Sequence, residues 1–242
     1  TLLTLLRGIF TKSVILGENT IIDFLENICT RCGRIHFISR GVNFHNGQYI
    51  ALWPEKNYVA RKAQRMFEKL QVEVGKSNLE EIERIANRLN EIVIDLANDN
   101  DGISKNYEVQ FNELRKEYLA VQKMFDNLHG DNYYNNIQYR LTRFGNEISI
   151  VFQNYKADRN VLFTGDFGKK RNWSFIETNQ DGLVRMHSWY DVIKIPHHGT
   201  DSYYHSFFKR TKVTSEFMVP NGYINQHWNV SSKYNVDSIK KK

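Results

Sequence analysis

Two short apolar stretches of the sequence each end in side chains that can bind a metal ion or transfer a proton. Residues 160–166 read Asn-Val-Leu-Phe-Thr-Gly-Asp, and residues 190–200 read Tyr-Asp-Val-Ile-Lys-Ile-Pro-His-His-Gly-Thr. β-Branched and aromatic residues followed by Gly or Pro are typical of a buried strand. Asp166, His197 and His198 therefore follow the carboxyl ends of two predicted strands, where layered α/β folds build their sites. Because Zn²⁺-class ions bind carboxylate oxygen and imidazole nitrogen, these residues predict a metal site.

The same two stretches belong to a longer series of landmarks. Upstream lie Gln-Tyr-Ile-Ala-Leu-Trp-Pro at 48–54 and Asn-Glu-Ile-Ser-Ile-Val-Phe at 146–152, and downstream lies Met-Val-Pro-Asn-Gly-Tyr-Ile-Asn-Gln-His at 218–227. In this order the five landmarks resemble the carboxyl-terminal part of a metallo-β-lactamase-fold hydrolase, in particular the hydrolase-like domain of bacterial DNA-uptake competence proteins. Residues 48–54 and 146–152 resemble two strands of that domain, and residues 218–227 resemble its last strand and the Asn/Gly-rich turn that leads to a His. The resemblance implies an α/β fold, a metallo-β-lactamase-like αββα sandwich that is incomplete at its amino end and carries an inserted helical subdomain.

The resemblance also implies which residues do the chemistry. Two divalent metal ions, Zn or Mn, would lie close together, and Asp166 would bridge them because its two oxygens can reach both cations. His197 would bind metal or line the cleft, and His227 is the other candidate ligand. His198 would either support the metal ligands from behind or donate a proton to the leaving group, and Asp166 and His198 are the expected catalytic residues. Neighbouring residues that leave a strand point in opposite directions, so we do not expect His197 and His198 to bind the same ion.

One part of the family's pattern is missing. The His-x-His-x-Asp-His loop that supplies most of the family's metal ligands does not occur in the 242 residues. Residues 1–8, Thr-Leu-Leu-Thr-Leu-Leu-Arg-Gly, resemble the helix that follows this loop. Two interpretations stay open: the chain starts inside the fold, after a segment that carries the loop, or the protein has lost half of its site.

Polar residues after the histidine pair have a structural interpretation. Asp201 and Ser202 are expected to cap a helix that starts near Tyr203. A Ser-His-Asp triad of Ser202, His198 and Asp166 is disfavoured, because the strand-turn-helix Gly-x-Ser-x-Gly elbow that such hydrolases use is absent from the sequence.

Composition indicates a globular protein. Hydrophobic residues make up 41% of the chain and charged residues 25%, and no apolar run approaches the roughly 18 residues that a membrane span needs. We therefore expect no membrane partner. The only two cysteines, Cys29 and Cys32, exclude a disulfide scaffold and favour a cytoplasmic location. They share one face of an expected helix with apolar residues, which favours buried thiols over a zinc or redox site.

The net charge of +6 is unevenly distributed. From residue 139 onward there are 16 Lys and Arg against 9 Asp and Glu, which leaves 17 against 18 in residues 1–138. The basic excess thus lies on the segment that carries the landmarks, with Lys169, Lys170 and Arg171 directly after the Asp166 stretch. A basic field beside a metal site attracts a phosphate backbone, although solvated loop and tail charges explain the same pattern.

A long helical stretch interrupts the landmarks. Between Pro54 and about Gly130, three sets of apolar residues recur at helical spacing, within residues 59–70, 79–93 and 114–128. Ser77 with Glu80 makes a plausible capping box for the second helix. The predicted domains are 1–54 and 131–242 for the two parts of the metallo-β-lactamase-like fold, and 55–130 for a helical insertion that binds a substrate or a protein partner, or covers the sheet.

Together these features predict a metal-dependent hydrolase, most plausibly of phosphodiester bonds in nucleic acid or a nucleotide. Hydrolysis of an ester, thioester or lactone stays open, because the fold does not fix the substrate. The alternative from another class is a non-catalytic scaffold protein that keeps the sheet and works through its helical insertion. The abundance of Asn, Tyr, Lys and Ile suggests an AT-rich bacterial genome, and the oligomeric state is left open.

Overall fold

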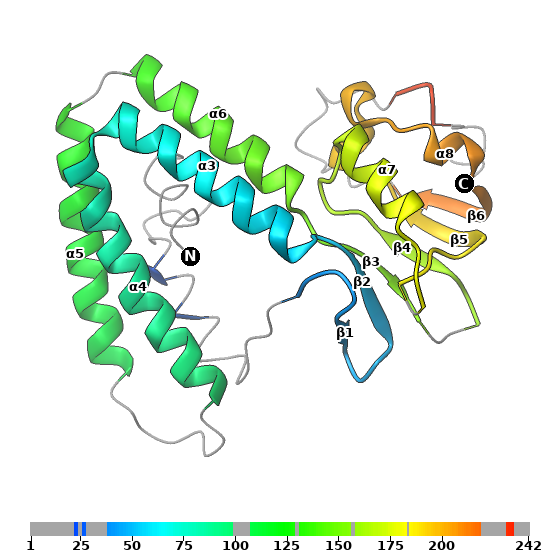
Figure 1. Ribbon diagram of the computed structural model, residues 1–242, viewed down its shortest axis with the longest axis horizontal. Coiled ribbons are helices and arrows are strands. Elements are labelled where there is room, and N and C mark those ends of the chain that lie inside the picture. Colours follow the sequence, from blue (N-terminus) through cyan, green and yellow to red (C-terminus); the bar gives the residue numbers. More distant parts are fainter. Residues whose placement is uncertain are drawn as a thin grey trace. The chain divides into compact units, whose positions relative to one another are not determined.

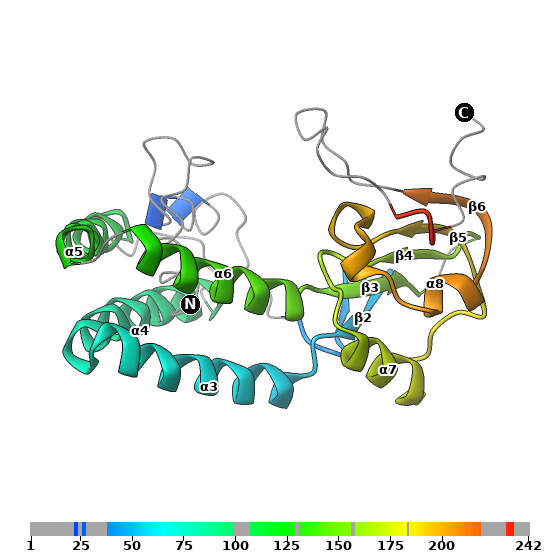
Figure 2. The ribbon, with the colours of Figure 1, turned by 90° about the horizontal axis from the view of Figure 1, so that it is seen from above.

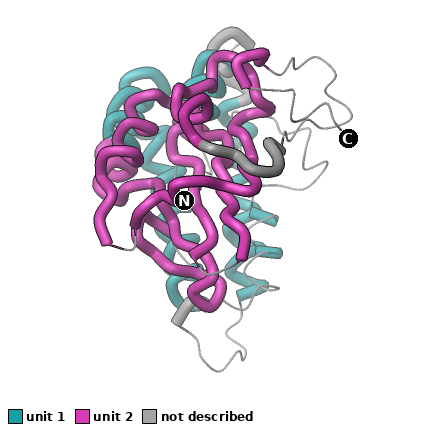
Figure 3. Tube along the Cα trace, turned by 90° about the vertical axis from the view of Figure 1, so that its right-hand side faces the viewer, with its two compact units in different colours: residues 1–37, 62–143 teal, residues 38–61, 144–242 magenta. Residues whose placement is uncertain are grey.

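The computed structural model describes residues 22–23, 26–27, 38–98, 107–128, 131–155, 158–182, 184–218 and 231–234. The chain divides into two compact units, a helical unit of residues 1–37 and 62–143 and a sheet unit of residues 38–61 and 144–242 (Figure 3). The division falls inside two helices, so neither unit is a continuous stretch of sequence. The predicted α/β class is confirmed. The division into units is a different description from the domain limits at residues 54 and 130, which stay a prediction from sequence.

The sheet unit is built on one six-stranded sheet whose strands follow one another in sequence order (Figures 1 and 2). Its strands are β1 (Asn43–Phe44), β2 (Tyr49–Trp53), β3 (Val151–Asn154), β4 (Val161–Phe163), β5 (Trp189–Lys194) and β6 (Lys212–Met218). Strands β1 to β4 pair antiparallel, whereas β4, β5 and β6 run parallel. Parallel strands end at the same edge of a sheet, so the segments after β4 and β5 emerge side by side.

Aromatic side chains fill the core of the sheet unit. Helix α7 (Lys170–Thr178), which joins β4 to β5, buries Trp173 and Ile176, and helix α8 (Phe207–Arg210), which joins β5 to β6, buries Phe207. The rings of Trp173 and Phe207 stack with centroids 5.1 Å apart. The predicted strands at residues 49–53, 161–163 and 190–194 are present. They contribute the buried side chains of Leu52, Trp53, Leu162, Tyr190 and Ile193 to this core. The αββα sandwich, which needs a second sheet, stays a prediction.

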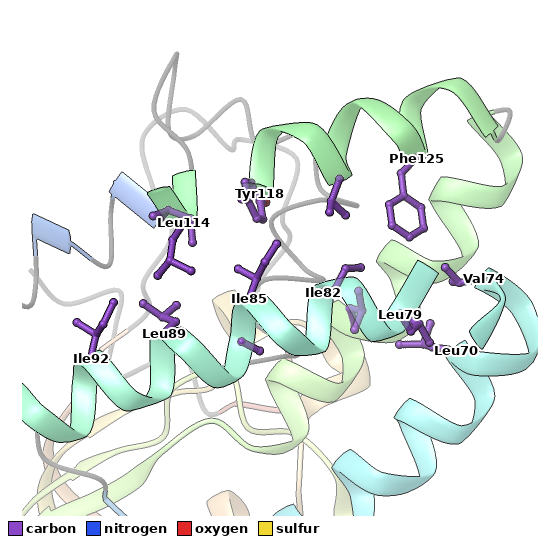
Figure 4. Close-up of a cluster of buried hydrophobic side chains, with 14 of the residues drawn as sticks. Leu70, Val74, Leu79, Ile82, Ile85, Leu89, Ile92, Leu114, Tyr118 and Phe125 are labelled. Atoms are coloured by element: carbon purple, nitrogen blue, oxygen red, sulfur yellow. The ribbon is translucent and has the colours of Figure 1, made fainter. Parts of the chain in front are cut away.

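Four long helices make up most of the helical unit: α3 (Lys56–Val74), α4 (Lys76–Asn98), α5 (Tyr107–Leu128) and α6 (Asp131–Glu147). The first three are the helices that the apolar spacing predicts. Leu79, Ile82 and Leu89 on α4 face Leu114 and Phe125 on α5 in a buried cluster (Figure 4). No helix within the described ranges combines the length and the apolar composition that crossing a membrane requires.

Helix α6 is one of several elements, with β1, β6 and α7, that the sequence interpretation missed. Residues 146–152 are predicted as a strand, but Asn146 and Glu147 end α6 and the strand starts only at Val151. Ile137 and Leu141, one helical turn apart, are buried in the helical unit. That spacing is the helix signal, and it is obscured by Asn and Tyr residues of low helix propensity. The predicted capping box is also wrong, because Ser77 lies inside α4, which begins at Lys76.

Candidate functional site

Asp166 and His197 meet at the carboxyl edge of the parallel strands. Strands β4 and β5 are in register there, with Phe163 opposite Lys194, and each is followed within three residues by one of the two side chains. Asp166 Oδ2 lies 3.8 Å from His197 Nδ1. The structure therefore brings together the carboxylate and the first imidazole that the sequence singles out.

The turn that carries Asp166 is tightly held. Thr164 Oγ1 donates a 2.7 Å hydrogen bond to the carbonyl of Lys194, and the Lys194 ammonium donates back to the carbonyl of Gly165. Gly165 has a φ of +52°, and a Cβ there would lie 3.0 Å from Ser149 Cβ. Because only glycine adopts this conformation without strain, the Gly before Asp166 fixes where the carboxylate stands.

The histidine pair lies on a backbone that is left-handed at consecutive residues. His197 has a φ of 42° and His198 of 58°, and Gly199 follows at 73°. Left-handed φ values at non-glycine residues are uncommon and cluster at functional sites. The prediction that the two imidazoles point in opposite directions assumes strand geometry, which these residues do not have. Their ring centroids lie 5.4 Å apart, with His198 beside the Asp166–His197 pair.

Two basic side chains, Lys194 and His197, lie close to the Asp166 carboxylate. Lys194 Nζ lies 3.9 Å from Asp166 Oδ1. Burial lowers the pKa of Lys194, and the Asp166 carboxylate opposes that shift. Burial also lowers the pKa of His197 from its ordinary 6.5, with Asp166 opposing and the charges of His198 and Lys194 adding to the decrease. The His197 imidazole is therefore neutral at pH 7, which is the form that binds metal or accepts a proton.

The Asp166–His197 pair matches part of a metal site. A separation of 3.8 Å is too long for a hydrogen bond. It is close to the roughly 3.4 Å between two ligands of one tetrahedral ion with bonds of about 2.0–2.2 Å. Within the residues that the structure describes, however, no group of three or more His, Cys, Asp or Glu side chains could hold a metal ion. The pair thus fits by donor type and spacing but supplies two ligands of about four.

The other predicted ligand, His227, lies outside the described residues, as do its Asn221-Gly222 turn, Cys29 and Cys32. Nothing in the described ranges therefore bears on their contribution to the site.

Two residues that the sequence interpretation did not assign to the site contact His197. The Tyr203 ring stacks on the imidazole with centroids 4.0 Å apart and an interplanar angle of 24°. Asn146, which is 8% exposed, donates a 2.9 Å hydrogen bond from Nδ2 to the Tyr203 hydroxyl. The same Nδ2 lies 3.5 Å from His197 Nδ1. Asn146 belongs to a sequence landmark, but its place at the site comes from the fold. Helix α6 ends beside the turn His197–Gly199, which we call the histidine loop.

The predicted helix cap after the histidine pair is wrong. Asp201 begins a 3₁₀ turn that has no side-chain cap. Its carboxylate instead accepts hydrogen bonds from Ser231 Oγ and, at 2.6 Å, from Lys233 Nζ. The backbone N–H of Ser231 also donates to the Gly199 carbonyl at 2.8 Å. Residues 231–234 therefore contact the histidine loop and Asp201 and hold them through these hydrogen bonds.

Basic residues begin α7, which starts four residues after Asp166 in the sequence. Lys169 forms a 2.8 Å ion pair with Glu147, whereas Lys170 and Arg171 are exposed in the first turn of α7, which contains no acidic residue. The positive end of the α7 dipole and these two side chains together make the start of α7 electropositive.

Searches of protein-family models, curated proteins and solved structures found no match to this chain. The likeness to the metallo-β-lactamase fold therefore rests on the sequence landmarks.

Proposed function

We propose that the chain is a metal-dependent hydrolase of phosphodiester bonds, with Asp166 and His197 at the centre of its site. The observation that carries this proposal is the 3.8 Å approach of Asp166 Oδ2 to His197 Nδ1 at the shared carboxyl edge of β4 and β5. The resemblance of the landmarks to metallo-β-lactamase-fold hydrolases supports the same reading.

The roles follow from the chemistry of the side chains. Asp166 Oδ2 and the neutral His197 would hold a divalent cation, Zn or Mn, with further donors such as His227 from outside the described residues. Such an ion, when bound, makes hydroxide from water at neutral pH and polarises a phosphoryl oxygen. His198, whose ring lies 5.4 Å from that of His197, would protonate the leaving oxygen.

The preference for a phosphodiester rests on charge. Lys170 and Arg171 are exposed in the first turn of α7, and this helix begins four residues after Asp166. An anionic phosphate backbone is attracted by such a group, whereas a neutral ester or lactone gains nothing from it. Nucleic acid or a nucleotide is therefore the proposed substrate class.

Metal content and turnover test the proposal together. The full chain, purified with Zn²⁺ or Mn²⁺ present, is expected to retain one to two ions per chain, on the order expected for such sites, and to hydrolyse bis(p-nitrophenyl) phosphate and single-stranded DNA. Asp166→Asn should lose both the metal and the turnover while the circular dichroism spectrum is unchanged. Asp158→Asn, which changes an exposed carboxylate of the sheet unit, is the matched control and should lose neither.

A second candidate is a non-catalytic scaffold protein. It is favoured by the position of Lys194, whose ammonium lies 3.9 Å from Asp166 Oδ1 and neutralises the charge that a cation would use. A folded chain that retains no metal after metal-replete purification and hydrolyses neither substrate would select the scaffold and reject the hydrolase.

A further inference from the structure

We propose that His205 is a pH-sensitive switch at the start of α8. The neutral ring accepts a hydrogen bond from the Phe207 N–H through Nδ1, and the imidazolium releases this N–H and pairs with Glu177 instead. The switch lies between the histidine loop and α8, and it does not rest on the proposed function.

His205 holds the first two amides of α8. Its Nδ1 accepts a buried 3.1 Å hydrogen bond from the Phe207 N–H, and its carbonyl accepts one of 3.1 Å from the Phe208 N–H. Ser206, which directly precedes the helix, makes no side-chain cap. Because the first N–H groups of a helix have no acceptor within the helix, the His205 ring supplies the cap from one residue further back.

The bond to Phe207 requires an unprotonated Nδ1. A backbone N–H only donates, so the ring nitrogen that it bonds must offer its lone pair. The neutral ring of His205 therefore carries its proton on Nε2. Glu177 Oε2 lies 3.8 Å from the same Nδ1, which is beyond hydrogen-bond range, and it acts on the ring through its charge.

The surroundings of the ring set its charge. His205 is 7% exposed, and its ring lies parallel to that of Trp173 with centroids 5.9 Å apart. Burial lowers the pKa of His205 from its ordinary 6.5. The Glu177 carboxylate of α7 opposes this decrease, whereas Arg210 of α8 and Lys170 of α7 add to it. The capping bond is thus complete above the ordinary value and is lost as the pH falls through the lower, folded pKa.

Protonation changes the partner of the ring. Once Nδ1 carries a proton, two donors face each other and the Phe207 N–H loses its acceptor. Glu177 Oε2, at 3.8 Å, is an acceptor that the new Nδ1–H reaches by a small rotation of the side chain. Arg210 pairs with the other oxygen of the same carboxylate, so Glu177 then holds both cations. The hydrogen bond of His205 thereby passes from the backbone of α8 to a side chain of α7.

The switch controls one end of the segment that follows the histidine loop. Tyr203 lies in this segment, and its ring stacks on that of His197 with centroids 4.0 Å apart. Release of the Phe207 N–H therefore loosens the attachment of this segment to α8 in mild acid.

The test follows the ring and the amide together. The ¹⁵N-labelled full chain is titrated without added metal from about pH 8 to about pH 5, above the range in which Asp201 titrates. Long-range ¹H–¹⁵N correlations report the protonation of His205, and hydrogen exchange reports the protection of the Phe207 amide. We expect the Nε2–H form at the start, and a protection that falls about 2- to 10-fold, as loss of one hydrogen bond does, with the midpoint of the ring. A neutral ring with its proton on Nδ1, or a protection that stays constant while His205 is protonated, would overturn the proposal.

Two substitutions of His205 separate the acceptor from its titration. His205→Asn keeps an acceptor, because an Asn side-chain oxygen bonds the N–H two residues further on, but it does not titrate. The Phe207 amide is therefore expected to stay protected over the whole range, whereas His205→Ala should show the low protection at every pH. His45→Asn, the same change at an exposed histidine between β1 and β2, is the control and should keep the wild-type profile. A pH dependence that survives in folded His205→Asn would reject the switch.

Glu177→Gln shifts the switch without changing the ring. The carboxylate favours the imidazolium, so its removal is expected to lower the pKa of His205 and to move the midpoint of the Phe207 amide to lower pH by the same amount. A Phe207 midpoint that stays in place while that of His205 moves would show that another group controls the amide. These measurements use neither metal nor substrate, so their outcome is independent of the test of the hydrolase.

Discussion

Gly165 shows how one residue sets the position of Asp166. Its φ is +52°, and an added Cβ would lie 3.0 Å from Ser149 Cβ and 3.3 Å from the Ile150 carbonyl. We predict that Gly165→Ala lowers the free energy of unfolding by about 2 kcal/mol or more, from about 1–2 kcal/mol for the left-handed backbone plus the steric contact. Gly182→Ala, with a φ of +47° and no atom of the described residues within 4 Å of the added Cβ, should lose the backbone part alone. Equal losses in urea denaturation would contradict the steric contribution.

The charge on Lys194 depends on Asp166. Burial lowers the pKa of the Lys194 ammonium and Asp166 opposes it, so Asp166→Asn is predicted to lower that pKa further. The folded pKa lies below the unfolded one. The buried ammonium therefore costs stability at neutral pH, and the cost is relieved as the pH rises through the folded pKa.

A ¹³C-detected titration of the lysine side chains measures this shift, with Asp158→Asn as the control for a general loss of negative charge. A Lys194 pKa that is unchanged or higher in Asp166→Asn would show that the carboxylate at 3.9 Å does not act on the ammonium.

At the residue scale the sequence predicts where β4 and β5 end, but it does not predict which side chains surround a given residue. Asp166 and His197 could be paired from sequence because each follows an apolar run that must be buried, and parallel neighbours end together. Lys194 lies inside one of those runs, yet its contact with Gly165 depends on the register of β4 and β5. Tyr203 and Asn146 lie 57 residues apart, so no local pattern connects them.

At the scale of elements, the segment Ser231–Tyr234 acts as a strap on the histidine loop. Tyr234 is buried, with its ring centroid 5.3 Å from that of Phe208. Lys233 and Ser231 both bond Asp201. Through the hydrogen bond from the Ser231 N–H to the Gly199 carbonyl, this strap holds the left-handed backbone of the loop.

The strap should be sensitive to acid. The hydrogen bonds from Lys233 and Ser231 lower the pKa of Asp201 below its ordinary 3.8. The stabilisation they give is therefore complete above that ordinary value and is lost as the pH falls through the lower, folded pKa. We predict that the Ser231 amide, which bonds the Gly199 carbonyl, loses protection from hydrogen exchange in this acid range.

Asp201→Asn should remove that pH dependence and weaken the protection already at pH 7. Asp181→Asn, which changes an exposed carboxylate paired with Arg40, is the control. Protection of Ser231 that falls with the same pH profile in Asp201→Asn and in the wild type would show that another group controls the strap.

Helices and strands could be predicted from sequence where burial gives their apolar residues a regular spacing. The apolar residues of α3, α4 and α5 recur at helical spacing because one face of each helix packs into a core, and the strands β2, β4 and β5 are short apolar runs for the same reason. Helix α6 has the same pattern in Ile137 and Leu141, but its polar composition favours a loop. Packing in the helical unit outweighs this low helix propensity. A short window of sequence contains no information on that packing.

At the scale of the whole molecule, each unit has its own hydrophobic core. The buried cluster of the helical unit draws on α3 to α6, and that of the sheet unit draws on the strands, α7 and α8. Among the described residues, the two clusters have no member in common. Since burial of apolar surface is the dominant favourable term in folding, each unit contains the main source of its own stability.

Separate cores predict separate responses to a cavity. Leu89 of α4 and Leu162 of β4 are both fully buried, and replacing either by Ala should cost about 2.7–5 kcal/mol. Because the surrounding contacts lie within one cluster, Leu89→Ala is predicted to raise hydrogen exchange in peptides from residues 62–143 and Leu162→Ala in those from 144–218, each sparing the other range. The two variants are matched in chemistry and burial, so each is the control for the other. Exchange that rises in both ranges for either variant would mean that the units unfold as one cooperative body, and that the helical unit contributes directly to the stability of the Asp166–His197 site.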